Sequence, residues 1–315
     1  MNIWLVDFDG KIENFALMKL STYHRQKGDM VSLKFGCQEQ DLFSPHPDKV
    51  YISCLFSWNK DKAISYFDRL GCDKEIGGTG VDPYVSLPEH IENLKPDYTL
   101  YGRTRPVSSV SAIGFISRGC IRNCQWCVVP KKEGQIRRVS SAMDITGGFD
   151  SAIFLDNNFL AMQGCEHDLE WIASNGVKVD FNQGLDARLI TTKRAELLAR
   201  CKWIDCTRLA LDSDSYIPQV DTAISRLQDA GMPTSKIFVY CLIGFSGFES
   251  DVKRLMFLHG KGVRVFPMKF RDIETGISPA LGWDISKYNK YSRLIIRMPF
   301  ATSVWNDFEK EITSA

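Results

Sequence analysis

Short apolar runs and helical spacing alternate over the first 85 residues of the chain. Apolar runs at residues 2–7, 30–35 and 50–56 predict strands, and turn residues bound each of them. Residues 12–23 and 62–70 carry apolar side chains at helical spacing. Strands that alternate with helices of this length indicate a small parallel α/β domain over residues 1–85.

A second α/β region follows a proline-containing segment. Residues 86–110 show little apolar periodicity, and we interpret them as a linker. Six strands are then predicted, at residues 111–117, 151–156, 177–182, 207–212, 236–243 and 263–269. Helical spacing is clearest at residues 191–200 and 221–230. Six parallel strands with crossover helices favour a partial barrel over residues 111–275. Residues 276–315 form an aromatic and basic C-terminal extension.

The composition excludes several classes of protein. Of 315 residues, 44% are hydrophobic, which is enough for a packed core and argues against general disorder. Since 39 Lys and Arg face 38 Asp and Glu, no overall field attracts nucleic acid or a membrane, and nucleic-acid binding rests on a local patch. The longest apolar run, residues 237–245, is shorter than the ~20 residues of a membrane span. Asp7 and Asp9 interrupt the first apolar stretch, unlike a secretory signal, so we expect a reduced, cytoplasmic protein.

Three of the ten cysteines are bunched, and they carry the main chemical signal. Cys120, Cys124 and Cys127 lie in one predicted loop, whereas the other seven are scattered and read as small buried hydrophobes. Thiolates favour zinc, copper(I) or iron–sulfur clusters. A structural zinc site needs four protein ligands, and the nearest later candidates are Cys165 and His167. Three thiolates on a 4Fe–4S cube would instead leave one iron open for a substrate or cofactor. The loop follows a predicted strand, which places it at the carboxyl mouth of the predicted barrel.

The spacing of these cysteines, with Trp126 before the last one, resembles the signature of the radical SAM superfamily. The phrase Ser117-Arg118-Gly119-Cys120 looks like the subgroup that carries a cobalamin-binding-type domain before the radical SAM core. The resemblance covers most of the chain. It implies a Rossmann-like N-terminal domain and a partial (βα)6 barrel. It also implies a 4Fe–4S cluster whose open iron binds S-adenosylmethionine.

The resemblance further implies an oxygen-sensitive enzyme. An external reductant of the flavodoxin or ferredoxin type would supply one electron, and a 5′-deoxyadenosyl radical would abstract hydrogen from an unidentified substrate. The implied cofactor contacts are Trp126, Asp156, Asn158, Asn182, Gln183, Arg188, Asp212 and Ile243. Simpler interpretations stay open for several of them: an Asx turn at Asp156, an ion pair from Arg188 to Asp186, and a buried strand at Ile243.

The N-terminal domain departs from the subgroup. No histidine follows the first strand at residues 7–11, so we expect the domain to bind no cobalamin. The glycine run at residues 77–80 fits a phosphate site or a tight turn, and the turn is favoured because no phosphate-loop companion follows. Methylthio-transferring relatives use three further cysteines for an auxiliary cluster. Cys37, Cys54 and Cys72 match that number but not the local sequence.

Three functions are therefore retained. The first is a radical SAM enzyme with an unidentified substrate. The second is a methyl- or methylthio-transferase acting on RNA or protein, and the third is a metal-stabilised binding module without catalysis. Residues 288–297 have two interpretations, a surface that stacks bases and meets phosphates or an amphipathic helix that covers the barrel.

Overall fold

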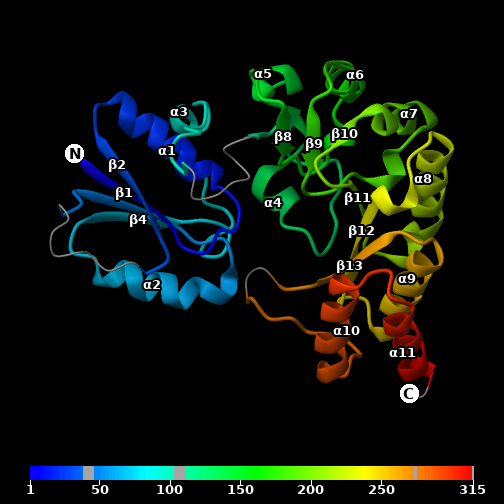
Figure 1. Ribbon diagram of the computed structural model, residues 1–315. Helices are drawn as coiled ribbons and strands as arrows, with labels where there is room; N and C mark the ends of the chain where they lie inside the picture. Colours follow the sequence, from blue (N-terminus) through cyan, green and yellow to red (C-terminus); the bar gives the residue numbers. More distant parts are fainter. Residues whose placement is uncertain (38–45, 103–110, 273–274, 314–315) are drawn as a thin grey trace. The chain divides into compact units, whose positions relative to one another are not determined.

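The computed structural model describes residues 1–37, 46–102, 111–272 and 275–313. The protein is of the α/β class, with largely parallel sheets and eleven α-helices in the described residues. It divides into two compact units (Figure 1). Unit 1 comprises Met1–Ile113 and Ile273–Gly276, and unit 2 comprises Gly114–Asp272 and Ile277–Ala315. Among the described helices, none has the length and apolar character that crossing a membrane requires.

Unit 1 contains a four-stranded parallel sheet in the order β2-β1-β3-β4. Its strands are β1 (Asn2–Asp7), β2 (Met30–Phe35), β3 (Lys49–Ser53) and β4 (Asp73–Gly77). Helices α1 (Phe15–Gln26) and α3 (Glu89–Glu92) cover one face, and α2 (Lys60–Arg69) covers the other (Figure 1). Alternation along β1 explains this, because Ile3 and Leu5 face α1 whereas Trp4 and Val6 face α2. The predicted parallel α/β architecture is confirmed, and β4 is an addition to it.

The segment interpreted as a linker begins inside unit 1. Ile91, Leu100 and Tyr101 are buried against α1. The Tyr101 hydroxyl donates to Asp7 Oδ2 at 2.8 Å and accepts from the Asn14 main-chain N–H at 2.9 Å. The prolines of this segment interrupt its apolar periodicity, although several of its side chains are buried. Unit 1 therefore extends well past the predicted boundary at residue 85. Residues 103–110 of the linker prediction lie outside the described residues.

Two further sheets have the orders β10-β9-β8-β5 and β11-β12-β13, and their residues belong to unit 2 except for Ala112 and Ile113 of β5. The strands of the first are β5 (Ala112–Gly114), β8 (Ser151–Phe154), β9 (Lys178–Phe181) and β10 (Lys202–Trp203). Those of the second are β11 (Thr207–Leu211), β12 (Ile237–Ile243) and β13 (Arg264–Lys269). A parallel bridge between Leu185 and Leu209 connects residues beside β9 and within β11. The pairs β8–β9, β9–β10, β11–β12 and β12–β13 are parallel, so within each sheet the carboxyl ends of these strands share an edge.

The six predicted strands of this region are all present, with one change. The predicted strand at residues 111–117 divides into β5 and β6 (Ser117–Arg118), and β6 pairs antiparallel with β7 (Arg137–Arg138). The helices between strands are α4 (Val129–Glu133), α5 (Ala142–Thr146), α6 (Cys165–Asn175), α7 (Thr192–Arg200), α8 (Ile217–Asp229) and α9 (Phe248–Gly260). Residues 273–274 of the predicted barrel are not described.

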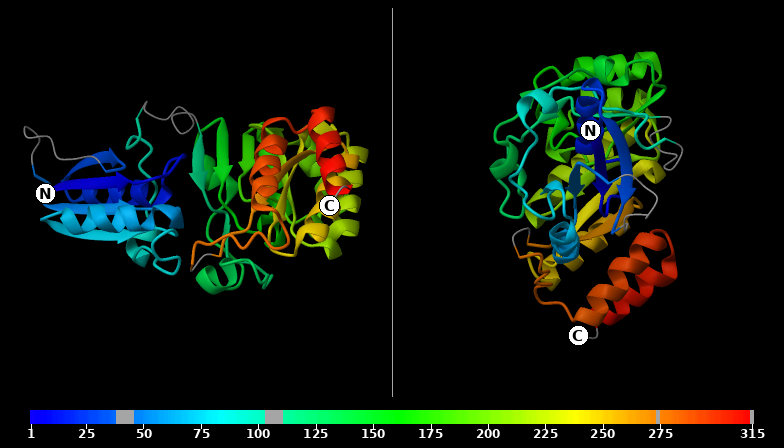
Figure 2. Two further views of the ribbon diagram at one scale, coloured as in Figure 1. Left: turned by 90° about the horizontal axis from the view of Figure 1, so that it is seen from below. Right: turned by 90° about the vertical axis from the view of Figure 1, so that its left-hand side faces the viewer.

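The C-terminal extension is a pair of helices, α10 (Ile285–Arg297) and α11 (Thr302–Thr313), that lie side by side (Figure 2). Tyr288 and Tyr291 are buried, with 3% and 1% exposure. The Tyr288 hydroxyl donates to the Ile243 carbonyl at 3.1 Å. The amphipathic-helix interpretation of this stretch is therefore confirmed, and its tyrosines present no face for stacking bases. Residues 314–315 of the extension are not described.

Candidate functional site

The three bunched cysteines lie on one short loop between β6 and α4. The Cys120 N–H donates to the Gly134 carbonyl at 3.1 Å, and the Cys127 N–H donates to the Cys124 carbonyl at 3.1 Å. Gly119 has φ +84°, and a Cβ there would stand 2.3 Å from the Gln135 carbonyl oxygen. Only glycine allows the chain to close so tightly at this position. The loop therefore has a fixed base, with three half-buried free thiols.

Glu133, at the end of α4, fixes the base of this loop. Its carboxylate accepts from Arg118 Nε and Nη2 at 3.2 and 3.0 Å, from the Gly119 N–H at 3.0 Å and from Asn157 Nδ2 at 2.8 Å. Charge-assisted bonds of this kind are about twice as strong as neutral ones. Glu133 was not predicted as a site residue, and its place fourteen residues after Gly119 gave no signal in the sequence.

Asp186 joins the loop to the ends of two strands. Its carboxylate accepts from Arg122 Nε at 3.1 Å, from Asn158 Nδ2 at 3.4 Å and from Arg188 Nε and Nη2 at 2.7 and 3.0 Å. The Arg188–Asp186 ion pair expected as one alternative is present, and the Asp186 side chain is only 7% exposed. Burial raises the pKa of Asp186, but Arg188 and Arg122 outweigh it and lower the pKa below its usual value. The carboxylate thus stays charged and orients Arg188, which also lies 4.2 Å from the Tyr216 ring centroid.

The thiols are buried enough to resist ionisation on their own. Burial raises the pKa of both Cys124 and Cys127, and the neighbouring thiols and Asp212 raise it further. Cys120 Sγ accepts from the Arg122 N–H and from Asn158 Nδ2, both at 3.3 Å. A positive metal centre that replaces the thiol protons would relieve this cost, because metal ligation deprotonates thiols.

Two buried oxygen atoms beside the loop have no hydrogen-bond partner among the described residues, Asn158 Oδ1 and Asp212 Oδ1. Asn158 follows β8, and its amide nitrogen contacts Cys120. Asp212 follows β11, and burial raises its pKa to about 6, although Arg254 and a hydrogen bond from the Trp126 side chain act against the shift. Buried acceptors without partners are costly, so a ligand that brought donors to these two atoms would relieve that cost.

Asp156 serves the fold at this edge. Its carboxylate accepts from the Ile116 N–H at 3.0 Å and from the Ser117 N–H and hydroxyl at 2.5 and 2.6 Å. Burial raises the pKa of Asp156 to about 6 in spite of these bonds. The carboxylate therefore ties the end of β8 to the turn between β5 and β6, and its predicted contact with the cofactor stays a prediction.

The remaining predicted contacts lie at strand ends of unit 2. The Asn182 carbonyl accepts from the Tyr240 hydroxyl at 3.1 Å, and Gln183 is exposed. Ile243 is buried at 1% exposure, as the buried-strand alternative expected. Trp126 packs edge-on against Phe245, with ring centroids 5.4 Å apart. Of the predicted set, Trp126, Asn158, Arg188 and Asp212 are tied most directly to the cysteine loop.

The cysteines of unit 1 have different surroundings. Cys37 is exposed, Cys72 is half-buried, and Cys54 is buried. The Cys54 thiol donates to Asp9 Oδ2 at 3.4 Å, and burial raises its pKa to about 12. The predicted auxiliary-cluster residues therefore include one strongly buried, protonated thiol.

Within the described ranges, no three His, Cys, Asp or Glu side chains converge as ligands of one metal ion do. A 4Fe–4S cluster binds each cysteine thiolate at a different iron atom. Its ligands therefore need not converge on one point, as the ligands of a single metal ion must. Comparison of the sequence with the known protein families and with curated proteins found no match.

Proposed function

We propose that the protein is a radical SAM enzyme in which Cys120, Cys124 and Cys127 hold a 4Fe–4S cluster. The observation that carries the proposal is the joint position of these thiols and the two unpartnered oxygens of Asn158 and Asp212. When bound, such a cluster supplies the electron that cleaves S-adenosylmethionine and so generates a 5′-deoxyadenosyl radical. The protein's part is to bind, orient and exclude water.

The side chains around the loop divide the binding work. Asn158 Oδ1 is an acceptor beside Cys120 and suits the amino group of S-adenosylmethionine. Asp212 Oδ1 suits its ribose hydroxyls. Arg188, oriented by Asp186, suits its carboxylate. Trp126 and Phe245 form an apolar wall that keeps water from the site.

The architecture supports the same proposal. The two sheets of unit 2, connected through the Leu185–Leu209 bridge, are consistent with a partial barrel, and unit 1 is consistent with a Rossmann-like domain. We propose that unit 1 binds no cobalamin. Its glycine run is accounted for by packing, because a Cβ at Gly78 or Gly80 would stand within 2.6 Å of the backbone of Cys54 or Phe56.

Anaerobic reconstitution with iron and sulfide tests the proposal. We expect a brown protein with about four irons per chain that cleaves S-adenosylmethionine to methionine and 5′-deoxyadenosine under reduction. Cys124→Ala should lose both iron and cleavage and stay folded, because a loop contributes little to the core. The control Cys37→Ala, at an exposed thiol, should lose neither.

Other outcomes identify the alternatives. One colourless zinc per chain without cleavage would contradict the proposal and indicate a metal-stabilised binding module. More than four irons, with part of them lost in Cys37→Ala, would indicate the auxiliary cluster of a methylthio-transferase. Cleavage that persists in Cys124→Ala would remove the cysteine loop from the mechanism.

A further inference from the structure

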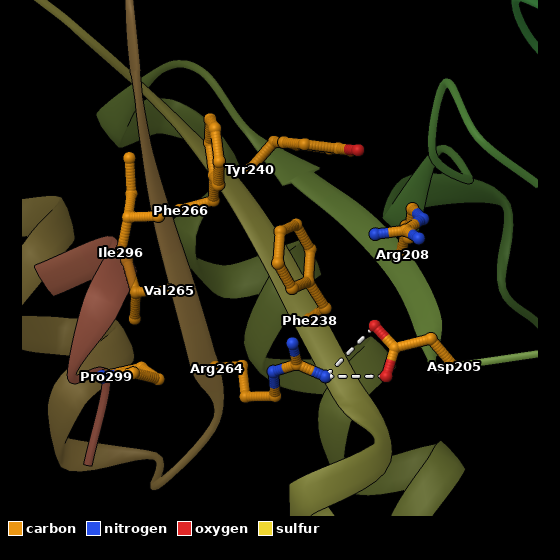
Figure 3. Close-up of a pocket in the computed structure, with 9 residues that line it drawn as sticks. All are labelled: Asp205, Arg208, Phe238, Tyr240, Arg264, Val265, Phe266, Ile296 and Pro299. Carbon is orange, nitrogen blue, oxygen red and sulfur yellow. Dashed lines mark hydrogen bonds and ion pairs between the residues drawn. The ribbon is translucent and has the colours of Figure 1, made fainter. Parts of the chain in front are cut away.

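A cavity of about 310 Å³ lies in unit 2 at the amino ends of β11, β12 and β13 (Figure 3). Arg208 and Phe238 are the second residues of β11 and β12, and Arg264 is the first of β13. The cavity is therefore at the opposite end of these strands from Asp212. Its volume lies at the lower end of the range for small-molecule sites, roughly 300–1,000 Å³.

The charges of this cavity are balanced within the protein. Arg208 donates through Nε and Nη2 to the two oxygens of Asp180, at 2.7 and 2.8 Å. Arg264 donates through Nη1 to both oxygens of Asp205, at 3.0 and 3.2 Å (Figure 3). Each guanidinium already has its counter-charge, so a phosphate or carboxylate would find no unneutralised cation here. The cavity suits a neutral ligand.

Arg264 brings unused donors to one side of the cavity. Arg264 keeps its Nε and Nη2 hydrogens, with no acceptor in the part of the chain that the structure describes. The Tyr240 hydroxyl donates to the Asn182 carbonyl at 3.1 Å, and both Asp205 oxygens already accept. A ligand must therefore present acceptor atoms to the Arg264 side of the cavity.

The rest of the lining is aromatic and aliphatic. Phe266 contacts both Phe238 and Tyr240, with ring centroids 5.8 and 5.6 Å apart. Ile296 and Pro299 complete the lining (Figure 3). An apolar lining with N–H donors at one place fits a flat ring with one polar edge.

We propose that this cavity binds a neutral heteroaromatic ring with two adjacent acceptors, of the guanine type. The O6 and N7 atoms of guanine form such an edge, and an arginine fork is their commonest partner. Adenine presents a donor at the corresponding exocyclic position and is disfavoured. The proposal does not depend on the cysteine loop, which lies toward the other end of the strands.

Calorimetric titration of the full chain with guanosine and adenosine tests the proposal. We expect saturable guanosine binding that is roughly 5- to 100-fold tighter than that of adenosine. Guanosine 5′-monophosphate should bind no better than guanosine, because the cavity is neutral. No saturable guanosine binding, equal binding of adenosine, or a large gain from the phosphate would each overturn the proposal.

Matched variants connect binding to the cavity. Ile296→Trp places bulk in the cavity from a partly exposed position and should abolish guanosine binding. Ile285→Trp, on the same helix but outside the lining, should not change it. Arg264→Lys keeps a charge opposite Asp205 but loses the fork, so it should remove the preference for guanosine. Unchanged binding in Ile296→Trp would place the ligand elsewhere. Cys124→Ala, which should lose the cluster, should still bind guanosine as the wild type does. The titration of this variant therefore distinguishes a failure of the cavity proposal from a failure of the proposed function.

Discussion

The carboxyl edges of the sheets in the two units carry similar polar residues, but their hydrogen bonding differs. At the edge of unit 1, Asp9 accepts from the N–H groups of Leu55 and Phe56 at 2.7 and 3.1 Å, and from Asn59 Nδ2 at 3.0 Å. Its neighbour Cys54 donates to the same carboxylate. At the edge of unit 2, buried oxygens of Asn158 and Asp212 have no partner among the described residues, and three thiols lie beside them.

Glycine shows the same contrast. In unit 1, Gly78 and Gly80 let their strand end pack directly on the backbone of Cys54 and Phe56. In unit 2, Gly119 closes only the base of the cysteine loop against Gln135. A parallel sheet edge therefore becomes a candidate site where its polar groups are left unused, and the fold alone does not decide this.

Gly78→Ala should disrupt the close packing at the carboxyl edge of the sheet in unit 1. Of the changes considered, we expect this one to lower stability most. Its Cβ would stand 2.3 Å from the Cys54 carbonyl oxygen, and φ is +97°. Strain and overpacking together should lower the free energy of unfolding by about 2–5 kcal/mol. Chemical denaturation monitored by circular dichroism measures this.

Gly28→Ala is the control for backbone strain alone. Gly28 has φ +80°, but no heavy atom lies within 4 Å of the position that an alanine Cβ would take, so the loss should be only about 1–2 kcal/mol. Equal losses in the two variants would contradict the close packing of the glycine run.

Asp156→Asn and Asp97→Asn compare the two units through the pH dependence of stability. Burial raises the pKa of Asp156 from 3.8 to about 6, so the unfolded chain ionises first, and the wild type loses about 2 kcal/mol as the pH rises from 4 to 6. Burial acts in the same direction on Asp97 in unit 1, but hydrogen bonds from Ser21 and Thr99 outweigh it and lower its pKa. The stability that Asp97 contributes is therefore present above about pH 4 and is lost as the pH falls below it.

Urea unfolding between pH 3 and 7 measures how the free energy of unfolding of each variant changes with pH. Relative to the wild type, Asp156→Asn should gain stability as the pH rises, and Asp97→Asn should gain it as the pH falls. Parallel profiles for the two variants would show that the two carboxylates have the same environment.

Much of the fold followed from local pattern, and the exceptions have physical causes. Strands β1 and β2 lie where the apolar runs predict them, since alternation and turn residues act within a few positions. Strand β4 was missed because its sequence, Asp-Lys-Glu-Ile-Gly, is mostly polar, yet pairing with β3 makes it a strand. The segment that carries Leu100 and Tyr101 was taken for a linker because its burial depends on α1, distant in sequence.

The candidate site was predictable in its cysteines but not in its supports. The spacing of Cys120, Cys124 and Cys127 is a local signal. Glu133 and Asp186 act through partners brought together by folding, such as Asn157 and Arg122, so no spacing announces them. The absence of a partner for Asn158 Oδ1 and Asp212 Oδ1 among the described residues is likewise a property of the packed structure.

Arg188→Ala tests the carboxyl edge of unit 2 beside the cysteine loop. Its expected effect, on cofactor affinity, is the smallest of those considered. If Arg188 meets the carboxylate of S-adenosylmethionine, its loss should weaken cofactor affinity roughly tenfold, about 1.4 kcal/mol. Stability should change little, because Asp186 keeps its bonds from Arg122 and Asn158. Arg194→Ala is the matched control, since Arg194 is also paired with a carboxylate, Glu166 at 2.8 Å, but not with the cysteine loop. Equilibrium binding to the reconstituted protein measures both, and equal affinities in the two variants would assign Arg188 to the fold alone.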